Sequence, residues 1–230
     1  MSYKVEFNDI GLKDYKEAWD FQSGIFNRLV ENKKTEVQSR PQLPGMLIFT
    51  EHPHVYTLGK SGSEDNLLLD PEQLKKRNAT YYRIDRGGDI TYHGPGQIVG
   101  YPVFDLEIIN IALKEYIYRL EEAIIRTVAE FGIDGSRLNG GTGVWLDPDV
   151  SSKARKICAI GVKASRFVTM HGFAFNVNTD LSYFSSINPC GFVDKGVTSL
   201  EKELGTKQDF GFVKVRVKEN LQKVFDLVWI

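Results

Sequence analysis

The sequence predicts an α+β fold, in which a mixed β-sheet carries flanking helices. Short runs with the two-residue alternation of strands and longer runs with helical spacing both occur, but without the regular βαβ order of a parallel sheet. The chain has 230 residues, enough for one domain with a sizeable core, and no repeat, linker or low-complexity segment divides it. We therefore expect a single domain over residues 1–230, with its motifs between about residues 46 and 204.

Strands are predicted where short apolar runs end at glycine, proline or polar residues. These runs lie at residues 3–7, 45–50, 79–85, 97–106, 144–146, 156–163 and 167–176, and directly after Pro53. The runs at 156–163 and 167–176 are close enough to form a hairpin. The polar stretches 33–43 and 147–155 are predicted to be surface connections.

Helices are predicted where apolar residues recur every three or four positions. Residues 14–32 and 113–131 show such a stripe, and Gly132 ends the second. Shorter helices are expected at 71–77, which begins with proline, and at 181–187 and 199–204. The last stretch fits two patterns, since residues 213–217 alternate like a strand and residues 217–228 have helical spacing. We predict a helix there.

Composition excludes several classes of function. Charged residues make up 26% of the chain and the net charge is −1, so overall charge does not attract the protein to nucleic acid. No apolar run approaches the length that spans a membrane, and the first residues lack the apolar core of a signal peptide. Two cysteines make no disulfide framework. We expect a reduced, cytoplasmic protein that binds neither nucleic acid nor membranes.

Residues 86–102 combine glycine and proline with polar side chains that a turn does not need. Gly87 and Gly88 taken alone are typical of a tight turn between strands. Arg86 and His93 lie in the same stretch, and glycine lets a ligand approach the main chain closely. Loops held by a rigid scaffold commonly carry binding groups. We interpret this stretch as the wall of a substrate site.

The two cysteines have different surroundings. Cys158 lies in an apolar strand and is expected to be a small buried residue. Cys190 lies between Pro189 and Gly191, in a tight turn that leaves a thiol open to a reactant. An ordinary thiol, with a pKa of about 8.5, is only a few per cent thiolate at pH 7, so a nearby cation would be needed to activate it. Cys190 is the candidate nucleophile.

Lys156, at the start of the strand that contains Cys158, is the candidate cation. By its spacing alone it would be a surface lysine at a strand end. The histidines, including the His52-Pro-His54 pair, lack the spacing of a metal site. We expect them to be structural or to hydrogen-bond a substrate, and we expect no metal.

Six segments together resemble the octanoyltransferases of lipoate biosynthesis, the LipB family. They occur in the family's order and cover most of the chain between residues 46 and 204. They are Glu51-His-Pro-His-Val-Tyr-Thr-Leu-Gly59, Arg86-Gly-Gly-Asp-Ile-Thr-Tyr-His-Gly-Pro-Gly-Gln97, Gly143-Val-Trp145, Lys156-Ile-Cys-Ala-Ile-Gly161, His171-Gly-Phe-Ala-Phe-Asn-Val-Asn178 and Asn188-Pro-Cys-Gly191.

The resemblance implies the fold shared by lipoate and biotin protein ligases. It also implies transfer of an octanoyl group from acyl carrier protein to a lysine of a lipoyl domain, through a cysteine thioester and without a cofactor. The acceptors would be the lipoyl domains of 2-oxoacid dehydrogenases and the glycine cleavage H protein. Cys190 would be the nucleophile and Lys156 its activator. The implied substrate-binding residues are Arg86, Gly87, Gly88, Asp89, Ile90, Thr91, Tyr92, His93, Ala159, Ile160, Gly161, Gly172, Phe173 and Ala174.

Two other functions stay open at this point. An ATP-dependent lipoate-protein ligase of the same fold would need no cysteine and would use a glycine-rich loop and a lysine against an adenylate. A non-catalytic acyl-carrier-binding module would hold the acyl chain without turnover. The Pro189-Cys190-Gly191 turn favours the transferase over the ligase, and a hydroxylamine-sensitive thioester on Cys190 would count against the binding module.

Overall fold

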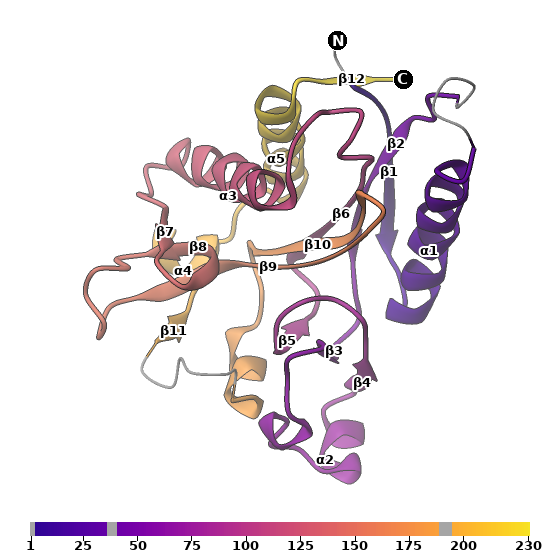
Figure 1. The fold of residues 1–230 in the computed structure, drawn as a ribbon. Coiled ribbons are helices and arrows are strands. Elements are labelled where there is room, and N and C mark those ends of the chain that lie inside the picture. The colour runs from indigo at the N-terminus through magenta and orange to yellow at the C-terminus, as the bar shows by residue number, and fades with distance from the viewer. Residues whose placement is uncertain (1–2, 36–40, 189–194) are drawn as a thin grey trace.

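The computed structural model describes residues 3–35, 41–188 and 195–230 (Figure 1). Its main feature is a nine-stranded sheet with the order β12-β1-β2-β6-β10-β9-β8-β7, in which β11 also pairs with β9. The strands are β1 (Tyr3–Leu12), β2 (Gly45–Glu51), β6 (Gln97–Val103), β7 (Ser136–Leu138), β8 (Gly141–Leu146), β9 (Arg155–Ser165), β10 (Val168–Asn176), β11 (Gly196–Val197) and β12 (Leu227–Trp229).

The sheet is mixed, because β1 runs parallel to β2 and β12 and β11 runs parallel to β9, whereas the pairs β2–β6, β6–β10, β10–β9 and β9–β8 are antiparallel. The predicted hairpin is present as β9 and β10, with Val168 opposite Ser165 next to the turn. The α+β fold predicted from the sequence is therefore confirmed.

Helices cover both faces of the large sheet (Figure 1). The helices α3 (Leu113–Ala129) and α5 (Phe210–Phe225) pack with one set of strand residues, and α1 (Tyr15–Asn32) packs with the other. In β2 the side chains alternate between the two cores: Leu47 contributes to the α3/α5 side and Ile48 to the α1 side. Because helices cover both faces of the sheet, both sets of β2 side chains are mostly apolar, and the β2 sequence is a nearly continuous apolar run.

Local signals explain where the first helix begins. Asp14 accepts hydrogen bonds from the backbone N–H groups of Lys16 and Glu17 and so caps α1, which carries the apolar stripe seen in the sequence. None of the helices in the described ranges is long and apolar enough to cross a lipid bilayer.

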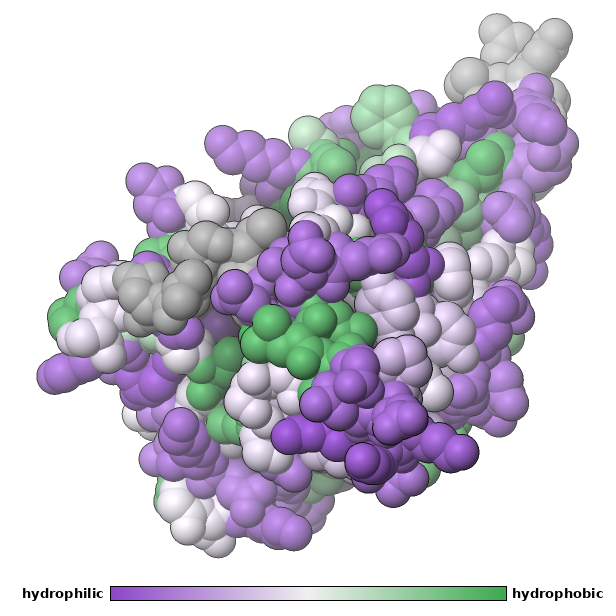
Figure 2. Space-filling model, turned by 90° about the horizontal axis from the view of Figure 1, so that it is seen from below, coloured by the Kyte–Doolittle hydropathy of each residue, from purple (hydrophilic) through white to green (hydrophobic). Residues whose placement is uncertain are grey.

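A second sheet of three strands lies below the large one in Figure 1. Its order is β4 (Thr80–Arg83), β3 (Val55–Leu58), β5 (Ile90–His93), and the short helices η2 (Glu64–Asn66), α2 (Pro71–Lys76) and η3 (Leu181–Ser186) lie near it. Viewed from this side, the surface is mostly hydrophilic, with one apolar area near its middle (Figure 2). Tyr92 and Tyr183 stack inside this unit at 4.8 Å between ring centroids.

Several elements differ from the sequence predictions. Residues 86–96 are not a continuous loop, because they contain β5, whereas residues 97–102 belong to β6, within the strand predicted at 97–106. β4 and β5 both pair with β3, so residues 84–89 cross over the end of β3 rather than turning a hairpin. The helix expected at 181–187 is the 3-10 helix η3, α4 (Leu200–Leu204) lies within the helix expected at 199–204, and the final stretch is α5 followed by the short strand β12.

The prediction that residues 33–43 form a surface connection is wrong at Lys33. Its ammonium lies 2.5 Å from the Asp105 carboxylate, and the two side chains are only 5% and 3% exposed. Residues 36–40 of this stretch lie outside the described residues.

We expect Lys33→Met to lower the free energy of unfolding by about 3 kcal/mol, because it leaves the Asp105 charge buried without its ammonium partner. Lys34→Met is the matched control, since Lys34 is exposed and pairs with Glu31 at the surface. It should change stability by less than about 0.5 kcal/mol in the same urea titration. Equal effects of the two substitutions would contradict the buried pair.

Candidate functional site

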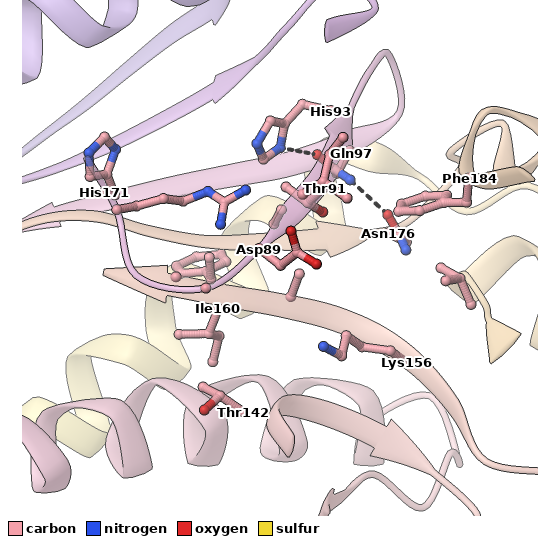
Figure 3. A pocket seen from close by; sticks show the side chains of 18 of the residues that line it. Asp89, Thr91, His93, Gln97, Thr142, Lys156, Ile160, His171, Asn176 and Phe184 are labelled. Atoms are coloured by element: carbon pink, nitrogen blue, oxygen red, sulfur yellow. Dashed lines mark hydrogen bonds between the residues drawn. The ribbon is translucent and has the colours of Figure 1, made fainter. Parts of the chain in front are cut away.

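A cavity of about 330 Å³ lies between the large sheet and the small one. β9 and β10 contribute Ala159, Gly161 and Ala174 to its wall, and residues 88–93 contribute the opposite side. This volume and mostly apolar lining are those of a small-molecule site. Figure 3 shows the polar side chains that project from several strands into the same space.

Arg86 lies in the cavity wall and is only 8% exposed. One of its terminal nitrogens donates to the Thr57 carbonyl at 2.7 Å and to the Thr57 hydroxyl at 3.1 Å, and the other donates to the Gly87 carbonyl. Within the described residues its Nε–H has no acceptor. Burial lowers the pKa of Arg86, since the charged guanidinium is removed from water. The cavity therefore has a fixed cation in its wall.

Lys156 also lines the cavity, where it is partly buried. Its Nζ lies 4.6 Å from the centre of the Trp145 ring. Burial lowers its pKa to about 8, and the positive charge of Arg86 acts in the same direction. Lys156 is thus a cavity residue rather than the surface lysine that spacing alone suggested, and it can exchange a proton near neutral pH.

Cys158 is fully buried in the α3/α5 core, as predicted. Burial raises the pKa of its thiol well above the usual range, so it is not a nucleophile. Cys190 lies outside the described residues. The described chain on either side of it reaches the cavity, because Ile187 and Lys195 both line it.

The histidines have different partners. His52 is fully buried, bonds the Lys13 carbonyl and the Tyr101 hydroxyl at 2.8 Å each, and has its pKa lowered to about 4 by burial. His171 donates from Nε2 to Asp85 at 2.9 Å. That hydrogen bond, together with Lys163, holds the pKa of Asp85 well below its usual range. Among the described residues no cluster of three or more histidine, cysteine, aspartate or glutamate side chains could hold a metal ion.

Most of the substrate-binding residues named from the sequence lie together in this cavity. Gly87 and Tyr92 do not line it. The Tyr92 side chain packs in the small sheet instead, with its hydroxyl oxygen 2.7 Å from His54 Nδ1. Three further lining residues, Gln97, Val99 and Tyr101, belong to the stretch 86–102 that was interpreted as a site wall. The structure adds residues that the sequence reasoning did not select: Tyr15, Ser61, Gly140, Gly141, Thr142, Trp145, Asn176, Phe184, Ile187, Lys195, Gly196 and Val197.

Some of these residues carried a signal in the sequence. Gln97 and Asn176 stand inside two of the six motif segments, and Gly140 and Gly141 form a glycine pair before a strand. Tyr15 carried none, because it belongs to the apolar stripe of α1 like any core residue. Its place in the cavity depends on how α1 packs across the sheet.

The structure is similar to solved lipoate ligases. A bipartite lipoate protein ligase from Thermoplasma acidophilum gives a TM-score of 0.69 at 13% identity, with 99% of this chain and 86% of that chain covered. A lipoate-protein ligase A bound with ATP gives 0.68 at 14% identity, covering 100% and 88%. At these identities the likeness shows the fold alone, and it confirms the predicted lipoate/biotin ligase type of fold.

The model of the lipoyl protein ligase A/B catalytic domain matches residues 14–222, and the chain belongs to this family. A protein of Parabacteroides distasonis named octanoyltransferase is 56% identical over 95% of this chain and 97% of its own length. One of Bacteroides fragilis with the same name is 57% identical over 95% and 96%. The resemblance predicted from the six motifs is confirmed.

Proposed function

We propose that the protein is an octanoyltransferase, an acyltransferase that moves an octanoyl group from acyl carrier protein to a lysine of a lipoyl domain. The observation that carries the proposal is the cavity itself: an apolar space of about 330 Å³ with Lys156, a lysine of lowered pKa, in its wall. The names of the curated relatives at more than 50% identity support the same activity.

In this proposal Cys190 is the nucleophile. Its thiolate attacks the thioester carbonyl of the donor, the carrier thiol leaves, and an acyl-enzyme thioester remains. Lys156 supplies the positive charge that favours the thiolate, because a cation beside a thiol lowers its pKa. Support comes from the ends of the surrounding chain, since Ile187 and Lys195 both line the cavity.

The second half of the reaction needs a base. The incoming lysine has an ordinary pKa of about 10.4 and must lose a proton before it can attack. Lys156, with its pKa near 8, is neutral in a useful fraction of molecules and accepts that proton. The amine then displaces Cys190 from the acyl group, and the thiolate is restored.

The proposal also covers the acyl-binding residues, the acceptor proteins and the cellular compartment. The acyl chain occupies the space between Ala159, Ile160, Gly161, Gly172, Phe173 and Ala174 on one side and residues 86–93 on the other. The acceptors are lipoyl domains of 2-oxoacid dehydrogenases and the glycine cleavage H protein, and the reaction takes place in the cytoplasm without a cofactor. Two cysteines, of which Cys158 is a buried free thiol, suit a reducing compartment.

The test is transfer without ATP. The protein is mixed with octanoyl-acyl carrier protein, and intact mass is measured before and after addition of a lipoyl domain. We expect a hydroxylamine-sensitive gain of one octanoyl group on the protein, which then moves to the lipoyl domain. A strict requirement for ATP would favour a ligase, and acyl-carrier binding without any mass gain would favour a binding module.

The side chains of the cavity wall are expected to set which acyl-chain lengths the protein transfers. Gly172→Val is a poor probe, because a Cβ there would collide with the Gly100 carbonyl of β6 and lie 2.6 Å from Pro102 Cδ. Ala159 already directs a side chain into the cavity wall. We expect Ala159→Leu to reduce transfer from decanoyl and octanoyl donors more than from hexanoyl donors, since each methylene excluded from an apolar site costs about 0.8 kcal/mol.

The measurement compares transfer rates from the three donors. Ala164→Leu is the matched control, because Ala164 is exposed on the same strand. It should leave the order of preference unchanged. Equal losses for all three donors in Ala159→Leu would show that the acyl chain does not extend past this position.

A further inference from the structure

A row of buried hydrogen bonds runs along the cavity wall, across strands of both sheets. The side chains are Arg86, Thr57, His93, Gln97 and Asn176, and each is at most 8% exposed. Figure 3 shows its central part, in which Gln97 lies between His93 and Asn176. Because these side chains are buried, each of their polar hydrogens is expected to have a defined donor and acceptor.

The directions can be assigned from the Asn176 end. Asn176 Nδ2 donates to the Thr198 carbonyl at 3.0 Å, so its Oδ1 faces Gln97 as an acceptor. Gln97 Nε2 uses both of its protons, one on Asn176 Oδ1 at 2.9 Å and one on the Tyr92 carbonyl at 3.2 Å. The Gln97 oxygen can therefore only accept, and it lies 2.9 Å from His93 Nδ1. His93 must carry its proton on Nδ1.

The other side of the imidazole leads to Arg86. His93 Nε2 lies 3.3 Å from the Thr57 hydroxyl oxygen, which also accepts a hydrogen bond from Arg86 at 3.1 Å. With Nδ1 protonated, Nε2 of a neutral imidazole is an acceptor, and the Thr57 hydroxyl donates to it. The row then has one consistent direction from Thr57 to the Thr198 carbonyl.

Charges around His93 oppose a second proton. Arg86 lies on one side of the row, the ring of His52 lies 5.9 Å from that of His93, and His52, Arg86 and His171 all act to lower the pKa of His93. Burial, more than these neighbours, lowers the pKa of His93 well below its ordinary value. A neutral imidazole can lie against an acyl chain, whereas a buried imidazolium would require solvation or a counter-ion.

We propose that Thr57, Gln97 and Asn176 are positioning residues that hold His93 as its neutral Nδ1–H tautomer and fix the Arg86 guanidinium in the cavity wall. None of the three is a catalytic residue in this proposal. They keep this side of the cavity with the Arg86 cation in a fixed position and the His93 ring uncharged. The inference rests on the proposed function for its consequence in acyl binding, but the tautomer of His93 does not depend on any activity.

The first test is ¹⁵N NMR of the histidine side chains in the full chain. We expect His93 to show a protonated Nδ1 and an unprotonated Nε2 from pH 5.5 to pH 8. An Nε2–H tautomer, or protonation of His93 at about pH 6.5, would overturn the proposal. This measurement needs no variant and no substrate, so it is separate from the test of the transferase activity.

The second test uses Gln97→Met, which removes the acceptor for His93 Nδ1–H. We expect the tautomer to switch to Nε2–H, which then donates to Thr57. We expect KM for octanoyl-acyl carrier protein to rise about tenfold while kcat changes less than threefold, since the loss concerns binding of the acyl chain. Gln42→Met, at an exposed position, is the matched control and should change neither quantity.

Two substitutions of Thr57 distinguish the effect of its hydroxyl group from the effect of its side-chain shape. Thr57→Val removes the hydroxyl that joins His93 to Arg86 and should lower kcat/KM about tenfold, whereas Thr57→Ser keeps the hydroxyl and should restore most of the loss. Similar values for Val and Ser at this position, or an unchanged His93 tautomer in Gln97→Met, would contradict the positioning role.

Discussion

Cys190→Ser should abolish formation of the acyl-enzyme and slow transfer by at least about 10⁴-fold. A serine hydroxyl beside a lysine is hardly ionised near neutral pH, so it cannot replace a thiolate as nucleophile. The measurement is the intact mass of the protein after incubation with octanoyl-acyl carrier protein, together with the rate of octanoylation of a lipoyl domain. This substitution has the largest effect that we expect in the chain.

Cys158→Ala is the control for thiol chemistry. Cys158 is buried in the α3/α5 core, so its loss leaves a small cavity and should lower stability modestly without preventing acylation. Labelling that survives in Cys190→Ser but disappears in Cys158→Ala would overturn the assignment of the nucleophile.

The second largest effect is expected at Lys156. In the wild-type protein, transfer from the acyl-enzyme to the acceptor lysine should rise with pH and level off above about 8, because Lys156 is protonated below its lowered pKa and is a base only above it. Lys156→Arg stays protonated throughout this range. Its transfer step should be about 100-fold slower and should keep rising toward the ordinary pKa of the acceptor amine, about 10.4.

The Lys156 variants also test whether Lys156 lowers the pKa of the Cys190 thiol. Lys156→Arg keeps a positive charge and should leave the pH at which Cys190 is alkylated nearly unchanged, whereas Lys156→Ala should raise it toward the ordinary thiol pKa of about 8.5. Lys153→Ala, an exposed lysine before the same strand, should match the wild type in both assays. Identical alkylation profiles in wild type and Lys156→Ala would refute the pairing.

Much of the cavity lining could be predicted from the residues alone. Arg86 and His93 stand out because polar residues in a glycine-rich stretch are not explained by folding. Cys190, between proline and glycine, stands out from Cys158 for a similar reason. The structure brings Arg86, His93 and Lys156 to one cavity, and it places Cys158 in the core. The spacing of residues alone predicted a surface position for Lys156. That prediction was wrong, because a position at a strand end does not show which other segment of the chain covers it.

The sequence by itself determined the order of the longer helices and of most strands, the continuous apolar run of β2, and the motif residues. These features depend on local periodicity and on residue chemistry, which can be recognised from residues close together in the sequence. Tertiary structure decided how the strands pair, which side chains share the cavity, and which partners the buried polar groups have. Tyr15, Gln97 and Asn176 come from distant parts of the chain, so their meeting depends on how α1, β6 and β10 pack, and no local pattern records that contact.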